Sequence, residues 1–265
     1  MAETEIEILH GLHAVQAALE HEPERITGLW IEQGRHDRRI RELEETARAA
    51  GVKVRRVPRE ALDRRAPGRR HQGVVAEVQA LPPRDEAQLL PLLESLAEPA
   101  FLLVLDGVQD PHNLGACLRT ADAAGVHAVI APKDRACGLT GTVRKVASGA
   151  AETVPFFQVT NLARTLRRLQ EAGIWLVGTD VDADTDLFAA DLTGPLALIL
   201  GAEGRGLRRL TREACDTLIS LPMRGTVQSL NVSVATGICL YEALRQRDAA
   251  GEQGRGPSGE VGGGA

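Results

Sequence analysis

The chain has 265 residues, of which 43% are hydrophobic and 25% are charged, and its formal net charge is -5. These proportions argue against a disordered chain, and no apolar run approaches the roughly 18 residues of a membrane span. The length favours two domains, and the net negative charge argues against nucleic-acid binding unless positive charge is concentrated locally.

The amino terminus and the cysteines favour a cytoplasmic protein. The first ten residues, MAETEIEILH, are too acidic and polar for a secretory signal. The four cysteines, Cys117, Cys137, Cys215 and Cys239, form no C-x-x-C pair and no cluster with histidines. We therefore expect reduced, mostly buried thiols, with neither a disulfide framework nor a metal site.

Residues 1–80 are expected to form a small α/β domain. Short β-like runs alternate there with helical stretches of amphipathic character. The β-like runs are 26–31, 52–57 and 74–78, and the helical stretches are 11–20 and 37–50.

One part of this domain is strongly basic. Residues 53–70 contain eight lysines and arginines but only two acids, which gives a local charge of +6 in an acidic protein. Such a stretch indicates an RNA-binding surface, although a solvated charged face would give the same pattern. His71 and Gln72 lie in a polar turn at the end of this stretch, and a purely structural role explains them equally well. The candidate RNA contacts are Arg64, Arg65, Arg69, Arg70, His71 and Gln72.

A linker and a larger α/β domain follow. Residues 81–98 begin with leucine and two prolines and are expected to form a linker of limited flexibility. Residues 99–248 contain apolar strand-like runs separated by helical stretches, which is typical of a largely parallel sheet covered on both faces. The glycine-rich tail, 249–265, is too poor in apolar residues to fold and is expected to be disordered. The strand-like runs are 101–105, 128–131, 174–177, 196–200 and 218–221.

The first segment with candidate chemistry, 106–121, follows the first of these strands. A polar turn and a helix starting near Asn113 place it at the carboxyl end of the sheet, where open α/β folds bind ligands. Asn113 suits the N-cap of that helix, and this structural role alone would explain it. Arg119 lies one to two turns into the helix, where it either serves a ligand or pairs with a neighbouring acid.

Two further segments also leave strands. Residues 200–207 read LGAEGRGL, and the order of the glycines does not match the dinucleotide fingerprint G-x-G-x-x-G. Glu203, framed by glycines, indicates a ligand-facing loop more than a plain tight turn. Ser229 and Asn231 precede an amphipathic helix at 236–247. They can cap that helix, and its free N–H groups can also receive a carboxylate or a phosphate.

Together the three segments resemble the SpoU family of RNA 2′-O-ribose methyltransferases. The resemblance extends into the N-terminal domain at 11–15 and 71–73 and covers nearly the whole chain except the tail. Within the family it is greatest to members that methylate a guanosine of large-subunit (23S) ribosomal RNA. The motifs are Asp110-Pro111-His112-Asn113 with Gly115 and Arg119, Gly201-Ala202-Glu203-Gly204 with Gly206, and Pro222-Met223 with 229–235.

This resemblance implies a fold, a cofactor and an assembly. The catalytic domain is expected to contain a carboxy-terminal trefoil knot, which nothing in the periodicity of the sequence indicates. Two chains are expected to pair as a homodimer through helices of the knot region, and the apolar residues Val234, Ile238 and 240–244 of the last helix suit such pairing. S-adenosylmethionine is expected in the knot, held mainly by backbone groups at Thr179, Gly201, Leu221, Met223 and Leu230.

The resemblance also implies roles in catalysis and places Arg119 at the reacting hydroxyl. Because the pKa of a guanidinium exceeds about 12, we expect Arg119 to grip the adjacent phosphate and polarise the 2′-oxygen rather than act as a base. Asn113 would orient Arg119 or the ribose, and Glu203 would hold Arg119 or assist proton removal. Ser229 and Asn231 would shape the pocket. The sequence leaves the final acceptor of the proton open.

Three other interpretations remain open at the level of sequence. A tRNA ribose 2′-O-methyltransferase is one alternative substrate assignment. A non-catalytic RNA-binding protein would keep the basic stretch but would need neither Arg119 nor Glu203 in such loops. A base methyltransferase of a related knotted family is disfavoured by the combination of Asn113, Arg119 and Ser229-Leu230-Asn231.

Overall fold

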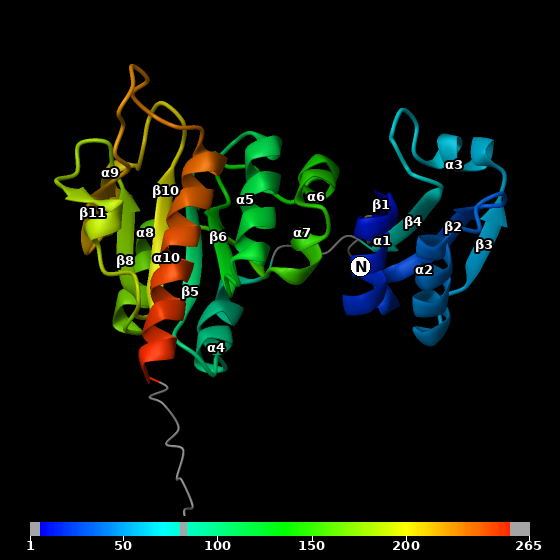
Figure 1. The fold of residues 1–265 in the computed structure, drawn as a ribbon, viewed down its shortest axis with the longest axis horizontal. Coiled ribbons are helices and arrows are strands. Elements are labelled where there is room, and N and C mark those ends of the chain that lie inside the picture. Colours follow the sequence, from blue (N-terminus) through cyan, green and yellow to red (C-terminus); the bar gives the residue numbers. More distant parts are fainter. Residues whose placement is uncertain (1–5, 80–83, 255–265) are drawn as a thin grey trace, which may run out of the picture.

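The computed structural model describes residues 6–79 and 84–254, which form two lobes of unequal size (Figure 1). The smaller lobe is built on a four-stranded sheet and the larger on a seven-stranded sheet. Within the described ranges, no helix is both long and apolar enough to cross a membrane.

The sheet of the small lobe has the strand order β1-β4-β2-β3. β4 runs antiparallel to β1 and β2, whereas β2 and β3 are parallel. Helices α1 and α2 bury one face of this sheet, and the short helix α3 covers the other face around Trp30. The elements are β1 (Ile6–His10), α1 (Leu12–His21), η1 (Pro23–Arg25), β2 (Ile26–Glu32), α2 (Arg38–Ala49), β3 (Val54–Val57), α3 (Arg59–Arg65) and β4 (Val74–Gln79).

The expected α/β character of this lobe is confirmed, with two elements that the sequence pattern did not predict. β1 is a short, half-exposed edge strand, so it lacks a clear alternation of apolar and polar residues. α3 lies inside the basic stretch, where five charged residues surround the buried pair Ala61 and Leu62. The strand expected at 52–57 is shorter and begins at Val54.

The large lobe contains a seven-stranded sheet of order β7-β6-β5-β10-β8-β11-β9, and every neighbouring pair is parallel. The five predicted strand runs all form strands, and β7 and β9 are additional. The strands are β5 (Phe101–Asp106), β6 (Ala128–Pro132), β7 (Phe156–Val159), β8 (Trp175–Thr179), β9 (Thr185–Asp186), β10 (Leu196–Gly201) and β11 (Thr217–Ser220).

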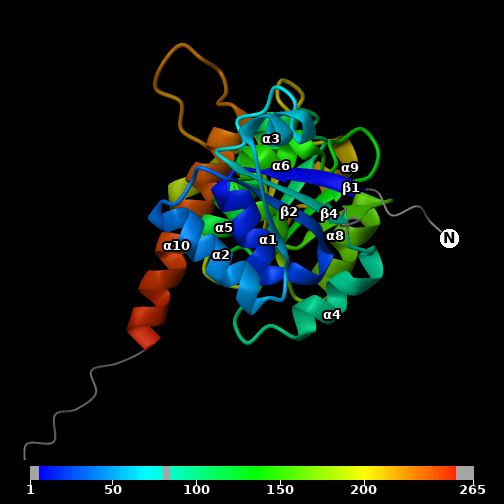
Figure 2. The ribbon, with the colours of Figure 1, turned by 90° about the vertical axis from the view of Figure 1, so that its right-hand side faces the viewer.

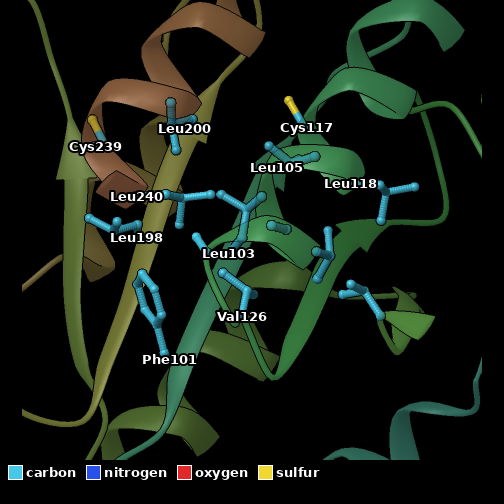
Figure 3. Packing of buried hydrophobic residues seen from close by; sticks show 14 of the residues in the cluster. Phe101, Leu103, Leu105, Cys117, Leu118, Val126, Leu198, Leu200, Cys239 and Leu240 are labelled. Atoms are coloured by element: carbon cyan, nitrogen blue, oxygen red, sulfur yellow. The ribbon is translucent and has the colours of Figure 1, made fainter. Parts of the chain in front are cut away.

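Helices cover both faces of this sheet, as its continuous apolar strands require. On one face, α5 and α10 pack across the central strands β5 and β10, with Leu118 and Leu240 among the buried contacts (Figure 3). On the other face, α4 and α8 bury Leu89, Leu162 and Leu166. The helices are α4 (Leu89–Glu94), α5 (Pro111–Ala123), α6 (Gly141–Ala147), α7 (Ala150–Thr153), α8 (Leu162–Glu171), α9 (Arg209–Ala214) and α10 (Val232–Gly254), with η2 (Glu86–Gln88) and η3 (Leu187–Ala189).

The segment expected to be a linker is largely part of the large lobe. Arg84 forms a parallel bridge with Phe157 of β7, and Leu89 is buried under the sheet. The side chain of Glu86 accepts a hydrogen bond from the hydroxyl of Thr165, at 3.0 Å, which ties η2 to α8. Residues 80–83, where the expected linker begins, lie outside the described residues.

The carboxyl end also differs from the expectation of a disordered tail starting at residue 249. Helix α10 continues to Gly254, so residues 249–254 are helical. This extension begins with two alanines, at 249 and 250, which favour helix, and it ends before the glycine-rich segment 255–265. Residues 1–5 and 255–265 lie outside the described residues.

Candidate active site

The carboxyl ends of β8, β10 and β11 open into a cavity of about 500 Å³. These strands are neighbours in the sheet, so the loops that leave them meet at one edge. All five residues expected to hold the cofactor line this cavity, although they are spread over more than fifty positions of the chain. They are Thr179, Gly201, Leu221, Met223 and Leu230.

Glycine is required where the chain leaves β10. A Cβ atom on Gly201 would lie 2.1 Å from the carbonyl carbon of Gly206, because the loop folds directly back on the strand. The amide of Gly206 donates a 2.9 Å hydrogen bond to the carbonyl of Ala202. Gly204 and Gly206 both have positive φ angles, 74° and 63°. The tight loop therefore exposes its backbone and Glu203 to the cavity.

Glu203 connects all three motif segments through its carboxylate. Its Oε1 atom accepts hydrogen bonds from the side-chain amides of Asn113, at 3.1 Å, and Asn231, at 2.5 Å. Asn231 also donates to Oδ1 of Asn113, at 3.0 Å. The backbone amide of Val232 reaches the same carboxylate oxygen at 3.3 Å. Residues 113, 203 and 231, predicted separately from the sequence, thus form one hydrogen-bonded cluster.

The helices that begin at this cluster start earlier than expected. Asp110, not Asn113, is the N-cap of α5, and its carboxylate accepts from the amide of His112 at 2.8 Å. Pro111 at the first helical position fits this start. Helix α10 begins at Val232 rather than at 236, and Oδ1 of Asn231 accepts from the amide of Ser233 at 2.9 Å. Asn113 is therefore free of the capping role and available to Glu203.

Arg119 lies exposed on α5 and makes no hydrogen bond or ion pair with any described residue. The alternative in which a neighbouring acid pairs with it is therefore not realised. Glu203 does not hold it either, because the described contacts of that carboxylate come from Asn113, Asn231 and Val232. An unpaired guanidinium on the first helix of the site remains available to a ligand.

Ser229 lines the same cavity, which agrees with a role in shaping it. Two acidic residues of the cavity wall, Asp180 and Asp182, were not predicted. Asp180 forms a 2.5 Å ion pair with Arg212, and this hydrogen bond holds the pKa of the Asp180 carboxyl below its usual value. Its position directly after β8 was the available signal, because polar residues at the carboxyl ends of parallel strands commonly face a ligand.

A second unpredicted feature joins the first two motif loops. Asp106, the buried last residue of β5, accepts hydrogen bonds from the backbone amide of Arg208 at 2.9 Å and from its Nε at 2.5 Å. A buried carboxylate needs such compensation, since an unpaired charge in the interior is costly. This pair fixes the loop after β10 against the loop after β5.

No cysteine belongs to the hydrogen-bonded cluster of Asn113, Glu203 and Asn231 in the described structure. All four are free thiols; Cys117 and Cys239 are buried, and the other two are half-buried. Cys117 and Cys239 lie where α5 and α10 pack (Figure 3). Burial raises the pKa of the Cys117 thiol to about 11 and that of Cys239 to about 12, so both stay protonated near neutral pH.

In the small lobe the predicted RNA contacts divide into two groups. Arg64, Arg69 and Arg70 are exposed. Arg65 is half-buried instead, with its guanidinium 4.4 Å from the ring centroid of Trp30 in a cation–π contact. Charge alone therefore overstates the number of free cations in this stretch.

His71 and Gln72 organise the turn before β4. The ring of His71 is only 2% exposed; its Nδ1 accepts from the amide of Gly73 at 3.0 Å and its Nε2 lies 3.0 Å from Asp63. Gln72 has a φ of 50°, and its side-chain oxygen accepts from the amide of Leu12, at 3.4 Å, at the start of α1. For His71 the structural interpretation of the turn is the correct one, because both ring nitrogens face protein partners.

The fold and the cavity together define an α/β enzyme that binds a nucleotide-sized ligand at the carboxyl ends of its parallel strands. Residues 100–241 match the profile of the SpoU rRNA Methylase family, and residues 8–84 match the profile described as RNA 2'-O ribose methyltransferase substrate binding. The chain belongs to the SpoU rRNA methylase family. The family resemblance noted in the sequence is therefore confirmed.

Individual relatives and solved structures agree with this assignment. The chain is 60% identical over 241 residues to the 23S rRNA (guanosine-2'-O-)-methyltransferase RlmB of Shewanella oneidensis, covering 91% of this chain and 98% of that one. Identity to the RlmB of Escherichia coli K12 is 57%, over 91% and 99% of the two chains. The SpoU methyltransferase AviRb from Streptomyces viridochromogenes, solved with AdoMet, superposes with a TM-score of 0.75 at 27% identity, covering 92% and 91%.

Proposed function

We propose that this protein transfers a methyl group from S-adenosylmethionine to the 2′-hydroxyl of a guanosine in 23S ribosomal RNA. The observation that carries the proposal is the cavity at the ends of β8, β10 and β11, next to the cluster of Asn113, Glu203 and Asn231. The 23S assignment is supported by relatives of that name, which are 57% to 60% identical over 91% of the chain.

The residues of the cavity fit S-adenosylmethionine in size and in chemistry. A volume of about 500 Å³ suits a ligand of that size, and the tight loop after Gly201 presents backbone groups instead of side chains. Asp182 and Glu203 supply carboxylates that suit a ligand carrying a sulfonium and an ammonium group, whereas Asp180 is already paired with Arg212. When bound, this cofactor supplies an activated methyl group. Backbone groups at Thr179 and Gly201, together with those at 221, 223 and 230, would hold it.

Side chains of the protein must orient the acceptor hydroxyl and help to remove its proton. An in-line methyl transfer needs the acceptor oxygen held in one orientation, and such alignment contributes several kcal/mol. The unpaired Arg119 would grip the phosphate beside the acceptor ribose and polarise its 2′-oxygen. Asn113 and Asn231 fix the orientation of the Glu203 carboxylate. This carboxylate is then the group of the cluster that could receive a proton.

The small lobe would bind the RNA substrate. Arg64, Arg69 and Arg70 are exposed cations in its basic stretch, and positive charge of this kind gives affinity for the phosphate backbone. Residues 1–80 would form this substrate-binding domain and 99–248 the methyltransferase domain. Because ribosomal RNA is the proposed substrate, we place the enzyme in the cytoplasm.

The catalytic domain would carry the trefoil knot of its family and pair as a homodimer through α10. Val234 and Tyr241 lie seven residues apart on this helix, and each is 51% exposed, so an apolar stripe faces outward. Leu240 and Ala243, which were included in the expected dimer face, are buried in the core of the same chain instead. Light scattering should give a dimer mass for the active protein, and a fully active monomer would contradict the pairing.

The test of function is to locate the transferred methyl group. The protein is incubated with tritium-labelled S-adenosylmethionine and either a 23S rRNA transcript or bulk tRNA, and the RNA is digested to nucleosides. We expect label on 2′-O-methylguanosine from the 23S transcript. Label on a base, label on tRNA alone, or no label in either RNA would each contradict the proposal, the last in favour of a non-catalytic RNA-binding protein.

A further inference from the structure

The two lobes meet through a network of paired, buried charges. Strand β1 lies against α6 (Figure 2), and α1 lies against α7. Glu152 of α7 pairs with Arg25 of the small lobe, at 3.0 Å, and with Arg144 of α6, at 2.7 Å. Arg144 also lies 2.6 Å from Glu7 of β1, and Arg25 also pairs with Glu22. Each of the two guanidinium groups is therefore compensated by carboxylates.

Two basic side chains beside this network have no such compensation. Lys145 is exposed on α6 and forms no ion pair with the described residues. Arg69 reaches from the small lobe to the start of the same helix, where a Cβ on Gly141 would lie 3.8 Å from its Nη1 atom. Its hydrogen bond, at 3.5 Å, goes to the backbone carbonyl of Ile8 and not to an acid. Two cations from different lobes are thus held near each other.

His10 of β1 lines a hollow together with Gly141 and Lys145 of α6. Its Nδ1 atom is buried and has no hydrogen-bond partner in the described part of the chain. Burial lowers the pKa of the ring, and the positive charges of Arg69 and Lys145 lower it further. The hollow lined by His10 and Lys145 has a volume of about 10 Å³. Glu7 is the one acidic residue in its wall among the described residues, and it pairs with Arg144.

Like charges held together across a boundary repel each other, and an anion between them would remove that repulsion. The hollow is too small to enclose a base or a sugar, since about 10 Å³ holds no more than one water-sized group. A phosphate oxygen at the surface of the hollow fits this size and charge. Arg69 is an exposed cation next to Arg70, the last residue of the basic stretch, so the phosphate of a bound RNA strand is the anion most directly presented to it.

We propose that His10, Arg69 and Lys145 form a phosphodiester-binding site between the two lobes, which grips the RNA backbone between the small lobe and the methyltransferase domain. This inference rests on the proposed function, because it takes the ligand to be the RNA substrate. It adds Lys145 and His10, from outside the basic stretch, to the RNA contacts. It also gives the network of paired charges a role, since that network holds the two halves of the site at a fixed separation.

The test compares the salt dependence of RNA binding for Lys145→Gln, Arg69→Gln and a control. Arg167→Gln is the control, because Arg167 is an exposed cation on α8, on the opposite face of the large sheet. Filter binding of a labelled 23S rRNA transcript is measured over a range of salt concentrations. We expect the slope of log affinity against log salt to shrink by about 0.7 to 0.9 for each of the two site variants and to stay unchanged for the control.

Two further readouts separate this site from other roles of the same residues. In steady-state methylation of the transcript, Lys145→Gln should raise KM with kcat nearly unchanged, because a remote phosphate contact contributes uniform binding. Without RNA and at low salt, the melting temperature of Lys145→Gln should equal or exceed that of the wild type, because a repelling charge is gone. Lys145→Arg, which keeps the charge, should bind RNA with nearly the wild-type affinity.

The proposal is overturned if Lys145→Gln binds RNA with the wild-type salt slope, even when Arg69→Gln does not, because the site would then not span the two lobes. It is also overturned if Lys145→Gln lowers the melting temperature without RNA, since Lys145 would then be a structural contact. Failure of the proposed function has a different signature: the wild type itself would leave the transcript unmethylated, whatever the salt slopes.

Discussion

The cavity of the large lobe and the basic stretch of the small lobe were both predicted from short pieces of sequence, but the two predictions fared differently. In the large lobe, five residues expected around a cofactor line a single cavity, and Asn113, Glu203 and Asn231 share one hydrogen-bonded cluster. In the small lobe, six residues expected on one RNA-binding surface divide between exposed cations and structural groups such as His71.

The difference has a physical cause. Loops that follow neighbouring parallel strands are brought to one edge of the sheet by the topology itself, so the position of a residue after its strand already indicates its location. A run of arginines contains no such positional information. Arg65 lies over the ring of Trp30 and not in solvent, because an arginine beside an aromatic ring gains a cation–π contact. Motif residues at strand ends are therefore predicted more securely than charged residues in a run.

The largest effect that would test this contrast is expected at Gly201. In Gly201→Ala the new Cβ would collide with the backbone of Gly206, so the loop after β10 must move. A displacement of about 1 Å can cost on the order of a hundredfold in reaction rate, and the moved loop should also weaken cofactor binding. Calorimetry with S-adenosylmethionine measures the loss.

Gly194→Ala is the matched control for Gly201→Ala, because a Cβ at Gly194 would meet no atom within 4 Å. Cofactor affinity in this control should equal that of the wild type. If Gly201→Ala also bound S-adenosylmethionine normally, the loop after β10 would not be part of the cofactor site.

Arg119 tests the chemical side of the same site. Arg119→Ala should lower the rate of methyl transfer on the order of a hundredfold, because a grip lost in the transition state costs about 3 kcal/mol. Cofactor affinity should hardly change, since Arg119 is absent from the cavity lining and forms no hydrogen bond or ion pair with the described residues. Single-turnover kinetics and calorimetry provide the two values.

Arg119→Lys is expected to restore little of this activity, because an ammonium cannot reproduce the planar guanidinium. Turnover near the wild-type rate in Arg119→Ala would show that the residue has no catalytic role. Loss of cofactor binding in the same variant would place it in the cofactor site instead.

His71 and Arg70, adjacent in sequence, sharpen the contrast within the basic stretch. His71→Ala removes a buried acceptor of the Gly73 amide and should destabilise the protein by about 1 to 3 kcal/mol. Arg70→Gln should change stability by less than about 0.5 kcal/mol but reduce the salt dependence of RNA binding, because Arg70 is exposed. Denaturant unfolding and filter binding measure the two effects, and equal stability losses would erase the distinction between them.

The smallest effect is expected from the end of the chain. Deletion of residues 255–265 should leave the melting temperature and the methylation rate nearly unchanged, because this segment contains a single large apolar residue, Val261. Thermal unfolding and the methylation assay check this. A fall of several degrees on truncation would show that the segment packs against the folded protein.

Much of the fold and part of the site could be predicted from the sequence. The apolar runs of β5, β6, β8, β10 and β11 were recognisable because central parallel strands are apolar throughout, whereas β9 has two residues and no such signal. Hydrogen-bond partners could not be predicted from the sequence, because Asp106 and Arg208 are 102 residues apart and only the folded sheet brings them together. The N-cap of α5 was misplaced from Asp110 to Asn113 because both residue types cap helices well.

The loops after β8, β10 and β11 are proposed to hold S-adenosylmethionine without any contribution from Arg119. A crystal structure of Arg119→Ala grown with S-adenosylhomocysteine tests this proposal. We expect the ligand in the cavity lined by Thr179, Gly201 and Leu221, with its adenosine against backbone groups of these loops. An empty cavity at saturating ligand, or a ligand bound elsewhere on the chain, would show that these loops are not the cofactor site.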